Sequence, residues 1–121
     1  KNIEIKKEKK TDSYSIKIIL EEGGKEMGWA YLYVIFQDRH LEPYGLMENV
    51  YINPEYRSRG LGKELVKLLI EEAKEQGCYK IIGTSKLSKP EVHSFYEKYG
   101  FDKMGYEFRM DLKASEVLTK D

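Results

Sequence analysis

The hydrophobic period of this chain changes near its middle, and this change restricts the possible folds more than any other feature. Apolar residues alternate over 14–20 and run almost unbroken over 27–36, whereas over 61–76 they recur at helical spacing. A chain of 121 residues has room for one compact domain and little more. We therefore predict a single α/β or α+β domain around a mixed sheet, in which several strands precede a strand–helix–strand unit, a second helix and a last strand.

The first half of the chain has the pattern of strands joined by tight turns. Every second residue of Tyr14–Leu20 is apolar, which gives a strand one apolar face. Gly23 and Gly24 supply the positive φ angles of a tight hairpin. Met27–Phe36 is apolar on both alternating sets, so a central strand covered on both faces is predicted there. Leu46–Ile52 is predicted to be a further strand.

The second half has the pattern of two amphipathic helices. The first is predicted over Leu61–Gln76, with Gly77 as a left-handed C-cap. A short strand over Tyr79–Gly83 follows it. The second helix begins at Ser88–Glu91, which has capping-box spacing with a proline in the first turn, and it ends at Gly100.

The two ends of the chain are predicted to add one strand each. Ile3–Glu8 is interpreted as a first strand, and the alternation over Met104–Met110 predicts the last one. Residues 1–12 and 112–121 are expected to be peripheral to the domain.

The composition excludes several classes of protein. Lys and Arg number 21 and Asp and Glu number 21, so the chain has no global attraction to nucleic acid or to an anionic membrane. No apolar stretch approaches the roughly 20 residues of a membrane helix, and the amino end lacks the apolar region of a signal peptide. Cys78 is the only cysteine, which rules out an internal disulfide and a cysteine-based metal cluster. We expect a cytoplasmic protein without a bound metal.

The segment Glu48–Lys63 is the one that predicts chemistry. A strand ends, the chain turns at Asn53-Pro54, and a helix begins through Arg57-x-x-Gly60-x-Gly62. The first amides of a helix lack internal partners and its macrodipole is positive there, so an anion is favoured. The two glycines remove Cβ atoms that would keep a phosphate away from those amides.

The glycines alone do not decide the interpretation, because a flexible loop with ordinary surface arginines has the same appearance. The segment is not the phosphate loop Gly-x-x-x-x-Gly-Lys-Ser/Thr, and it lacks the first glycine of Gly-x-Gly-x-x-Gly. The positive charge of Arg57, Arg59 and Lys63 around the same point favours a diphosphate.

Two motifs resemble those of the Gcn5-related N-acetyltransferase (GNAT) superfamily. Arg57-Ser58-Arg59-Gly60-Leu61-Gly62 is similar to the family's Gln/Arg-x-x-Gly-x-Gly/Ala, which opens the helix that binds the diphosphate of coenzyme A. The run Phe95–Phe101 resembles its Phe-Tyr-x-x-x-Gly-Phe block. The resemblance covers roughly 29–110 and implies the GNAT fold, with a mostly antiparallel mixed sheet, helices on both faces and a splayed pair of parallel strands.

By this resemblance the co-substrate is acetyl-CoA, bound where the strands 46–52 and 79–83 diverge near a bulge. An N–H near Val50 is expected to donate to the thioester carbonyl. The residues that the family pattern assigns to the pantetheine are Val50, Tyr51 and Ile52. Those assigned to the diphosphate are Arg57, Ser58, Arg59, Gly60, Leu61, Gly62 and Lys63.

Two side chains are the catalytic candidates that the resemblance implies. Tyr96 matches the tyrosine that protonates the departing thiolate, although on sequence alone it is also one more aromatic residue of its helix. Glu48 matches a carboxylate that acts as base in a number of members; the alternatives are that it binds a cationic substrate or simply ends a strand. His40, Glu42 and Asp38 are rival bases. Cys78 is interpreted as a semi-buried small residue and Tyr99 as a packing residue, whereas His93 is expected to face solvent or to cap local structure.

The chain departs from the family at two places. Where members often carry an asparagine that holds the pantetheine, this chain has Lys89, whose side chain is expected to reach the phosphates instead. The usual pair of helices after the first strand is reduced, so the acceptor site is expected to be open or to be completed by a second subunit of a homodimer.

The acceptor is the least constrained part of the prediction. Glu48-Asn49-Val50 and Gly77–Ile81 resemble a subgroup that includes glucosamine-6-phosphate N-acetyltransferases, but Thr84-Ser85 stands where that enzyme often has an aspartate. A polyamine, an aminoglycoside-like amine and a protein N-terminus are alternatives. A module that binds acyl-CoA without catalysis is the competing hypothesis to direct acetyl transfer to a primary amine.

Overall fold

The computed structural model describes residues 2–85 and 88–119. The chain forms two compact units, which meet in sequence between Gly83 and Thr84 and are described separately. That they make up one functional domain stays a prediction.

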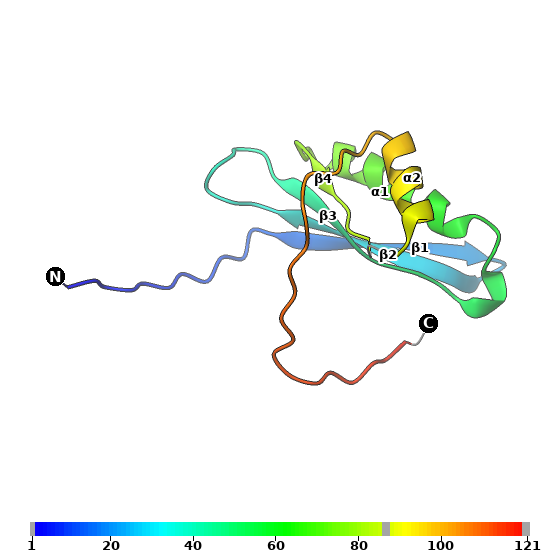
Figure 1. The fold of residues 1–121 in the computed structure, drawn as a ribbon, viewed down its shortest axis with the longest axis horizontal. Coiled ribbons are helices and arrows are strands. Elements are labelled where there is room, and N and C mark those ends of the chain that lie inside the picture. Colours follow the sequence, from blue (N-terminus) through cyan, green and yellow to red (C-terminus); the bar gives the residue numbers. More distant parts are fainter. Residues whose placement is uncertain (1, 86–87, 120–121) are drawn as a thin grey trace. The chain divides into compact units, whose positions relative to one another are not determined.

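The first unit is built on a four-stranded mixed sheet in which sheet order follows chain order (Figure 1). Its strands are β1 (Tyr14–Glu22), β2 (Lys25–Ile35), β3 (Tyr44–Ile52) and β4 (Ile81–Ile82). The first three pair antiparallel, whereas β3 and β4 are parallel. Gly23 and Gly24 form the β1–β2 hairpin with φ of 58° and 80°, which confirms the predicted turn. The 3₁₀ turn η1 (Pro54–Tyr56) then leads to helix α1 (Leu61–Glu75).

Helix α1 lies along one face of the sheet and forms the core of the unit with it (Figure 1). Its apolar stripe is the predicted one, and Leu65 and Leu69 are fully buried. They face the alternate residues of β2, of which Ala30, Leu32 and Val34 have no exposed surface. Gly77 ends this segment with φ of 77°, as predicted.

Only one face of β2 is buried to that degree, which corrects the prediction that both are covered. Trp29, Tyr31 and Tyr33 point away from the core residues and are half-buried. Aromatic side chains look apolar in a sequence pattern, but they also suit a face that is partly open, because a phenol or indole presents a polar edge.

Truncating the centre of this core should destabilise the protein measurably. Leu69→Ala removes a fully buried side chain and is expected to lower the free energy of unfolding by about 2–5 kcal/mol. Urea denaturation followed by circular dichroism measures the change. Leu41→Ala is the matched control, because Leu41 is 91% exposed and its loss should cost less than about 0.5 kcal/mol. Equal effects of the two substitutions would contradict this packing.

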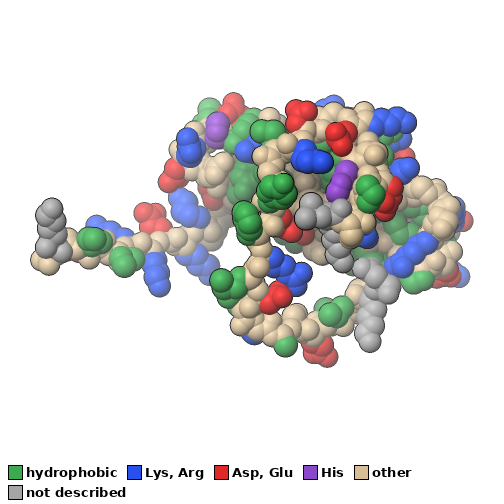
Figure 2. Space-filling view, viewed as in Figure 1, with side chains coloured by type: hydrophobic (Ala, Val, Ile, Leu, Met, Phe, Trp, Pro, Cys, Tyr) green, Lys and Arg blue, Asp and Glu red, His purple; other side chains and the backbone are tan. Residues whose placement is uncertain are grey.

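Two predicted strands of the first unit differ from the structure. Residues 3–8 form no strand; they are an exposed extended segment before β1, along which Figure 2 shows apolar and basic side chains. The strand predicted over Tyr79–Gly83 is reduced to Ile81–Ile82. Both segments have β-forming residues, but a strand forms only where a neighbouring strand accepts its hydrogen bonds.

The second unit contains the predicted second helix, α2 (Pro90–Lys98). Pro90 occupies the first turn as predicted, but the N-cap is Lys89 and it makes no side-chain capping bond, so the capping box predicted for Ser88 is wrong. At the other end Gly100 has φ of 96°, and the Phe101 amide donates to the Tyr96 carbonyl at 3.0 Å.

The last strand predicted over Met104–Met110 is absent. The described residues after Gly100 form neither helix nor strand, and Met104 and Phe108 are 90% and 92% exposed. The described part of the second unit offers no other strand for them to pair with, so the alternating pattern has no ladder in which to form.

Candidate cofactor and active site

The two parallel strands diverge after a short contact, as the resemblance predicted. Their register joins only Gly45 to Ile81 and Leu46 to Ile82, and the Gly45 amide donates to the Lys80 carbonyl at 2.9 Å. Beyond Leu46, β3 continues to Ile52 without pairing to β4. An edge of unpaired backbone of this kind can take an extended, amide-containing ligand as an added strand.

A bulge lies within this unpaired stretch. Trp29 of β2 faces Tyr51 and Tyr31 faces Glu48, so Asn49 and Val50 together oppose a single residue. Asn49 has φ of 56°, a conformation that asparagine tolerates better than most residues. The bulge therefore falls where the sequence predicted an N–H aimed at the thioester.

The three residues predicted to line the pantetheine differ in their surroundings. The Tyr51 carbonyl crowds Gly28 of β2, where an added Cβ would lie 2.5 Å from its oxygen. The Ile52 carbonyl accepts a hydrogen bond from Arg57 Nε at 2.8 Å. Val50 is 40% exposed at the bulge, and it is the most exposed of the three.

The turn between β3 and α1 is anchored to the sheet by Asn53. Its amide donates to the Met27 carbonyl at 2.8 Å, and its side-chain Nδ2 donates to the Glu26 carbonyl at 2.7 Å. The chain then passes through Ser58 and Gly60, whose φ angles are 66° and 75°. Gly60 is the N-cap of α1, and a residue with a Cβ would be strained there.

The start of α1 has the geometry that a phosphate group requires. The first helical bond joins the Glu64 amide to the Gly60 carbonyl at 3.2 Å, so the geometry of the helix provides no acceptor for the amides of 61 and 62. No side chain caps this end. A Cβ added at Gly62 would meet no atom within 4 Å, so the side-chain position of this residue in the first turn is open. The residues present thus fit a diphosphate.

The cationic side chains of the turn are partly engaged with the protein itself. Arg57, which bonds the Ile52 carbonyl, also lies over the Tyr51 ring at 5.5 Å. Arg59 forms an ion pair of 3.0 Å with Glu22 of β1. Lys63 lies exposed in the first turn of α1. The structure therefore places all three predicted cations at the turn, but it gives Arg57 an additional role in bracing the end of β3.

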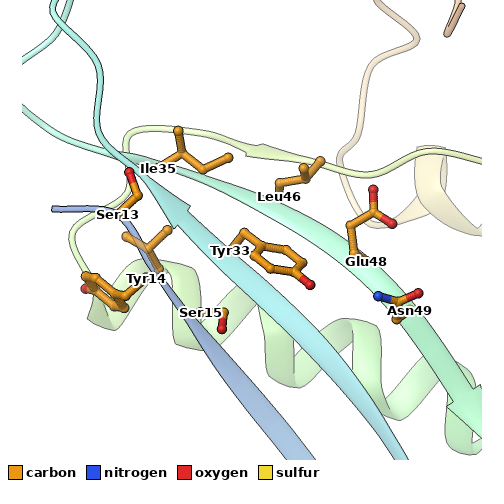
Figure 3. Close-up of a pocket in the computed structure, with 9 residues that line it drawn as sticks. Ser13, Tyr14, Ser15, Tyr33, Ile35, Leu46, Glu48 and Asn49 are labelled. Carbon is orange, nitrogen blue, oxygen red and sulfur yellow. The ribbon is translucent and has the colours of Figure 1, made fainter. Parts of the chain in front are cut away.

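Glu48 lies at the edge of a hollow on the sheet face opposite α1. The hollow has a volume of about 540 Å³, and its lining includes Ser15, Tyr33, Leu46, Glu48 and Asn49. Figure 3 shows Tyr33 of β2 next to Leu46 and Glu48 of β3. The predicted base is thus half-exposed beside this hollow, and it is close in sequence to the bulge at Asn49.

Tyr96 and Lys89 belong to the second unit. The Tyr96 hydroxyl lies 3.5 Å from the Thr84 carbonyl, and its ring contacts Phe101 at 5.1 Å between centroids. Burial raises the pKa of the Tyr96 phenol above its ordinary value of 10.0, so the group stays protonated at neutral pH, as a general acid must. Lys89 is exposed at the N-cap of α2.

The residues interpreted as structural, and one rival base, have packing contacts. The ring of Tyr99 contacts that of Phe95 at 4.7 Å between centroids, and the ring of His40 contacts that of Tyr79 at 4.2 Å. Burial raises the pKa of the Cys78 thiol, which therefore stays protonated at neutral pH and makes a poor nucleophile.

Two charged residues near these sites were not found from the sequence. Glu22 pairs with Arg59, and Lys17 lies over the rings of Trp29 and Tyr31 at 5.1 and 5.9 Å. The only available signal for Lys17 was its alternation with Ile16 and Ile18, which places it on the other face of β1.

No group of three or more His, Cys, Asp or Glu side chains within 2–85 and 88–119 is arranged to hold a metal ion. None of the helices in the described chain is long and apolar enough to cross a membrane.

The structure has a mixed sheet with a diverging parallel pair, and the first strand of that pair leads through a turn into helix α1. The start of this helix is open, which defines an α/β fold whose helix start suits an anion. The sequence model described as the acetyltransferase (GNAT) family matches residues 2–101. The chain belongs to that family, which confirms the resemblance seen in its two motifs and the fold that it implied.

Individual relatives agree with this assignment. Over 69 residues the chain is 44% identical to a glucosamine 6-phosphate N-acetyltransferase of Trypanosoma brucei brucei, a match that covers 56% of this chain and 44% of that protein. The chain therefore matches less than half the length of this curated relative.

Solved structures show the same fold. A Trypanosoma brucei acetyltransferase superposes with a TM-score of 0.69 at 32% identity, covering 81% of this chain and 69% of the other. The glucosamine-6-phosphate N-acetyltransferase of Arabidopsis thaliana superposes with a TM-score of 0.71 at 25% identity, covering 82% and 67%.

Proposed function

We propose that this chain is an acetyl-CoA-dependent N-acetyltransferase that moves the acetyl group directly to a primary amine of a small molecule. The observation that carries the proposal is the open start of α1 at Gly60–Gly62, which follows directly on the strand that diverges from β4. Family membership supports the same reaction class.

Acetyl-CoA supplies the acetyl group as a thioester. In this proposal the amides of 61 and 62 hold its diphosphate, and the edge of β3 near Val50 takes its pantetheine arm. An amide at the bulge donates to the thioester oxygen and stabilises the charge that develops there. Lys63 and the two arginines of the turn add a favourable electrostatic term.

Glu48 has the role of base. The amine must lose a proton before its lone pair can form a bond to the carbonyl carbon, and a half-exposed carboxylate beside the hollow can accept that proton directly or through water. The new C–N bond forms as the C–S bond breaks, so no acyl-enzyme and no reactive thiol are required.

Tyr96 has the role of acid. The electron pair of the broken C–S bond stays on sulfur, and a protonated phenol can neutralise the thiolate by donating its proton. The raised pKa of Tyr96 favours this form. The proposal requires its hydroxyl to reach the thioester sulfur in the working protein.

Removing the base should change the pH dependence as well as the rate. Glu48→Gln is expected to lower kcat/KM by about 10²-fold at neutral pH, and part of the rate should return as pH rises, because the amine then loses its proton without help. Steady-state rates over a range of pH measure both effects. Glu42→Gln is the matched control, and its kcat/KM should change little. A larger loss of kcat/KM in that variant would assign the role of base to the loop between β2 and β3.

The acceptor is proposed to be a small amine, with an amino sugar phosphate favoured over a polyamine because two of the relatives above are glucosamine 6-phosphate N-acetyltransferases. Release of free thiol from acetyl-CoA, measured with an amino sugar phosphate, a polyamine, an aminoglycoside and a peptide N-terminus, tests this. A clear preference for the sugar phosphate is expected. If coenzyme A raises the melting temperature but no amine releases thiol, the chain is a sensor of acyl-CoA and the proposed reaction is wrong.

A further inference from the structure

Three residues form a row across the sheet face opposite α1. Lys17 of β1 is the register partner of Tyr31 of β2, and Tyr31 is in turn the partner of Glu48 of β3. Register partners project from the same face, so an ammonium and a carboxylate flank one phenol ring. Because neighbouring strands lie about 4.8 Å apart, the Cα atoms of Lys17 and Glu48 are about 10 Å apart.

Both charges are available to a ligand. Neither Lys17 nor Glu48 forms an ion pair with any residue in the described ranges 2–85 and 88–119. Lys17 is instead held over the rings of Trp29 and Tyr31, at 5.1 and 5.9 Å from their centroids. An ammonium held by aromatic rings keeps its full charge and its hydrogen-bond donors.

The floor between the two charges is aromatic and leads into the hollow. Tyr31 and Tyr33 stack with their rings 5.8 Å apart at 14°, and Tyr33 lines the hollow next to Ser15 and Asn49. Flat rings edged by hydroxyl and carboxamide groups suit a ligand that has both an apolar face and several hydroxyls.

We propose that this row binds the acceptor as a compact zwitterion, with its amine at Glu48 and an anionic group at Lys17, and its body lying on Tyr31 and Tyr33. The inference rests on the proposed function and specifies its acceptor. Lys17 is then a specificity-determining residue that selects amines with an anionic group, such as an amino sugar phosphate.

The same charges disfavour a polyamine. Glu48 is the only acidic residue among the described residues that line the hollow. A second ammonium on the ligand would approach Lys17, and like charges repel at that separation. A phosphate in the same place is attracted, and the attraction should weaken as salt screens it.

Calorimetric titration of the coenzyme A-loaded protein separates these contributions. The three probes are glucosamine 6-phosphate, glucosamine and glucose 6-phosphate, which carry both groups, the amine alone and the phosphate alone. Glucosamine 6-phosphate should bind tightest. Its affinity should exceed that of glucosamine by about tenfold at low salt, and this ratio should shrink as salt is added.

Substitution of Lys17 assigns that advantage to one side chain. Lys17→Gln should weaken the binding of glucosamine 6-phosphate by about fivefold and leave the binding of glucosamine unchanged. Lys17→Arg should restore most of the lost affinity. Lys25→Gln, at the exposed start of β2, removes the same charge elsewhere and should have no effect on either ligand.

The outcomes separate this inference from the proposed function. The inference is wrong if Lys17→Gln weakens the binding of both amines equally or of neither, or if no probe binds. This holds even if the protein acetylates some other amine. If glucosamine 6-phosphate binds in the Lys17-dependent way but releases no thiol from acetyl-CoA, the inference stands and the transfer reaction is wrong.

Discussion

Replacing Tyr96 by Phe is expected to lower kcat by about 10²–10⁴-fold while the Kd of coenzyme A changes by less than about twofold. The substitution removes one oxygen from a half-buried ring that contacts Phe101, so the packing of α2 is kept. What is lost is the proton that the phenol would give to the thiolate. Stopped-flow detection of free thiol gives kcat, and calorimetry gives the Kd.

Tyr99→Phe is the matched control for this substitution. Tyr99 follows α2 directly and its ring contacts Phe95, but it has no proposed role in the reaction. Removal of the Tyr99 hydroxyl should leave kcat nearly unchanged. Equal losses in the two variants would show that the hydroxyls serve only folding, and an unaffected Tyr96→Phe variant would assign the acid to another group or to water.

Gly62→Glu is expected to abolish binding of coenzyme A, with Kd raised by about 10²-fold or more. Gly62 lies in the first turn of α1, where a Cβ meets no atom within 4 Å, so the variant should fold. Its carboxylate would occupy the open space in front of the helix and repel the diphosphate there. Fluorescence competition or calorimetry measures the loss, and thermal unfolding checks the fold.

Two further substitutions make this test specific. Gly62→Ala adds a methyl group without charge and should weaken binding far less than the glutamate does. Gly105→Glu introduces the same charge at an open position of the second unit and should leave binding unchanged. Loss of binding in the Gly105 variant, or full binding in Gly62→Glu, would contradict the placement of the diphosphate. Gly60 is a poorer choice, because its φ of 75° strains any side chain.

The elements predicted well are those whose evidence is local. The stripe of Leu65, Leu69 and Ala73 predicts α1 without reference to any other segment, and the paired glycines of the first hairpin carry their own φ requirement. The Arg57–Gly62 motif could be placed at a helix start because the period changes at that point.

The errors concern properties that depend on distant partners. Met104–Met110 has the alternation of a strand, but a strand also needs an edge to pair with, and no local pattern reports whether one is present. The bulge at Asn49 and Val50 is visible only in the register of β3 against β2. Lys17 was missed for a similar reason, because a lysine between two isoleucines looks like an ordinary solvated position until its cross-strand neighbours are known.

A crystal structure with coenzyme A bound would test the central claim most directly. The account predicts that the diphosphate oxygens accept hydrogen bonds from the amides of 61 and 62, and that the pantetheine arm runs along the unpaired edge of β3 past Val50. Coenzyme A bound elsewhere on the protein, with the first turn of α1 facing only solvent, would contradict the account.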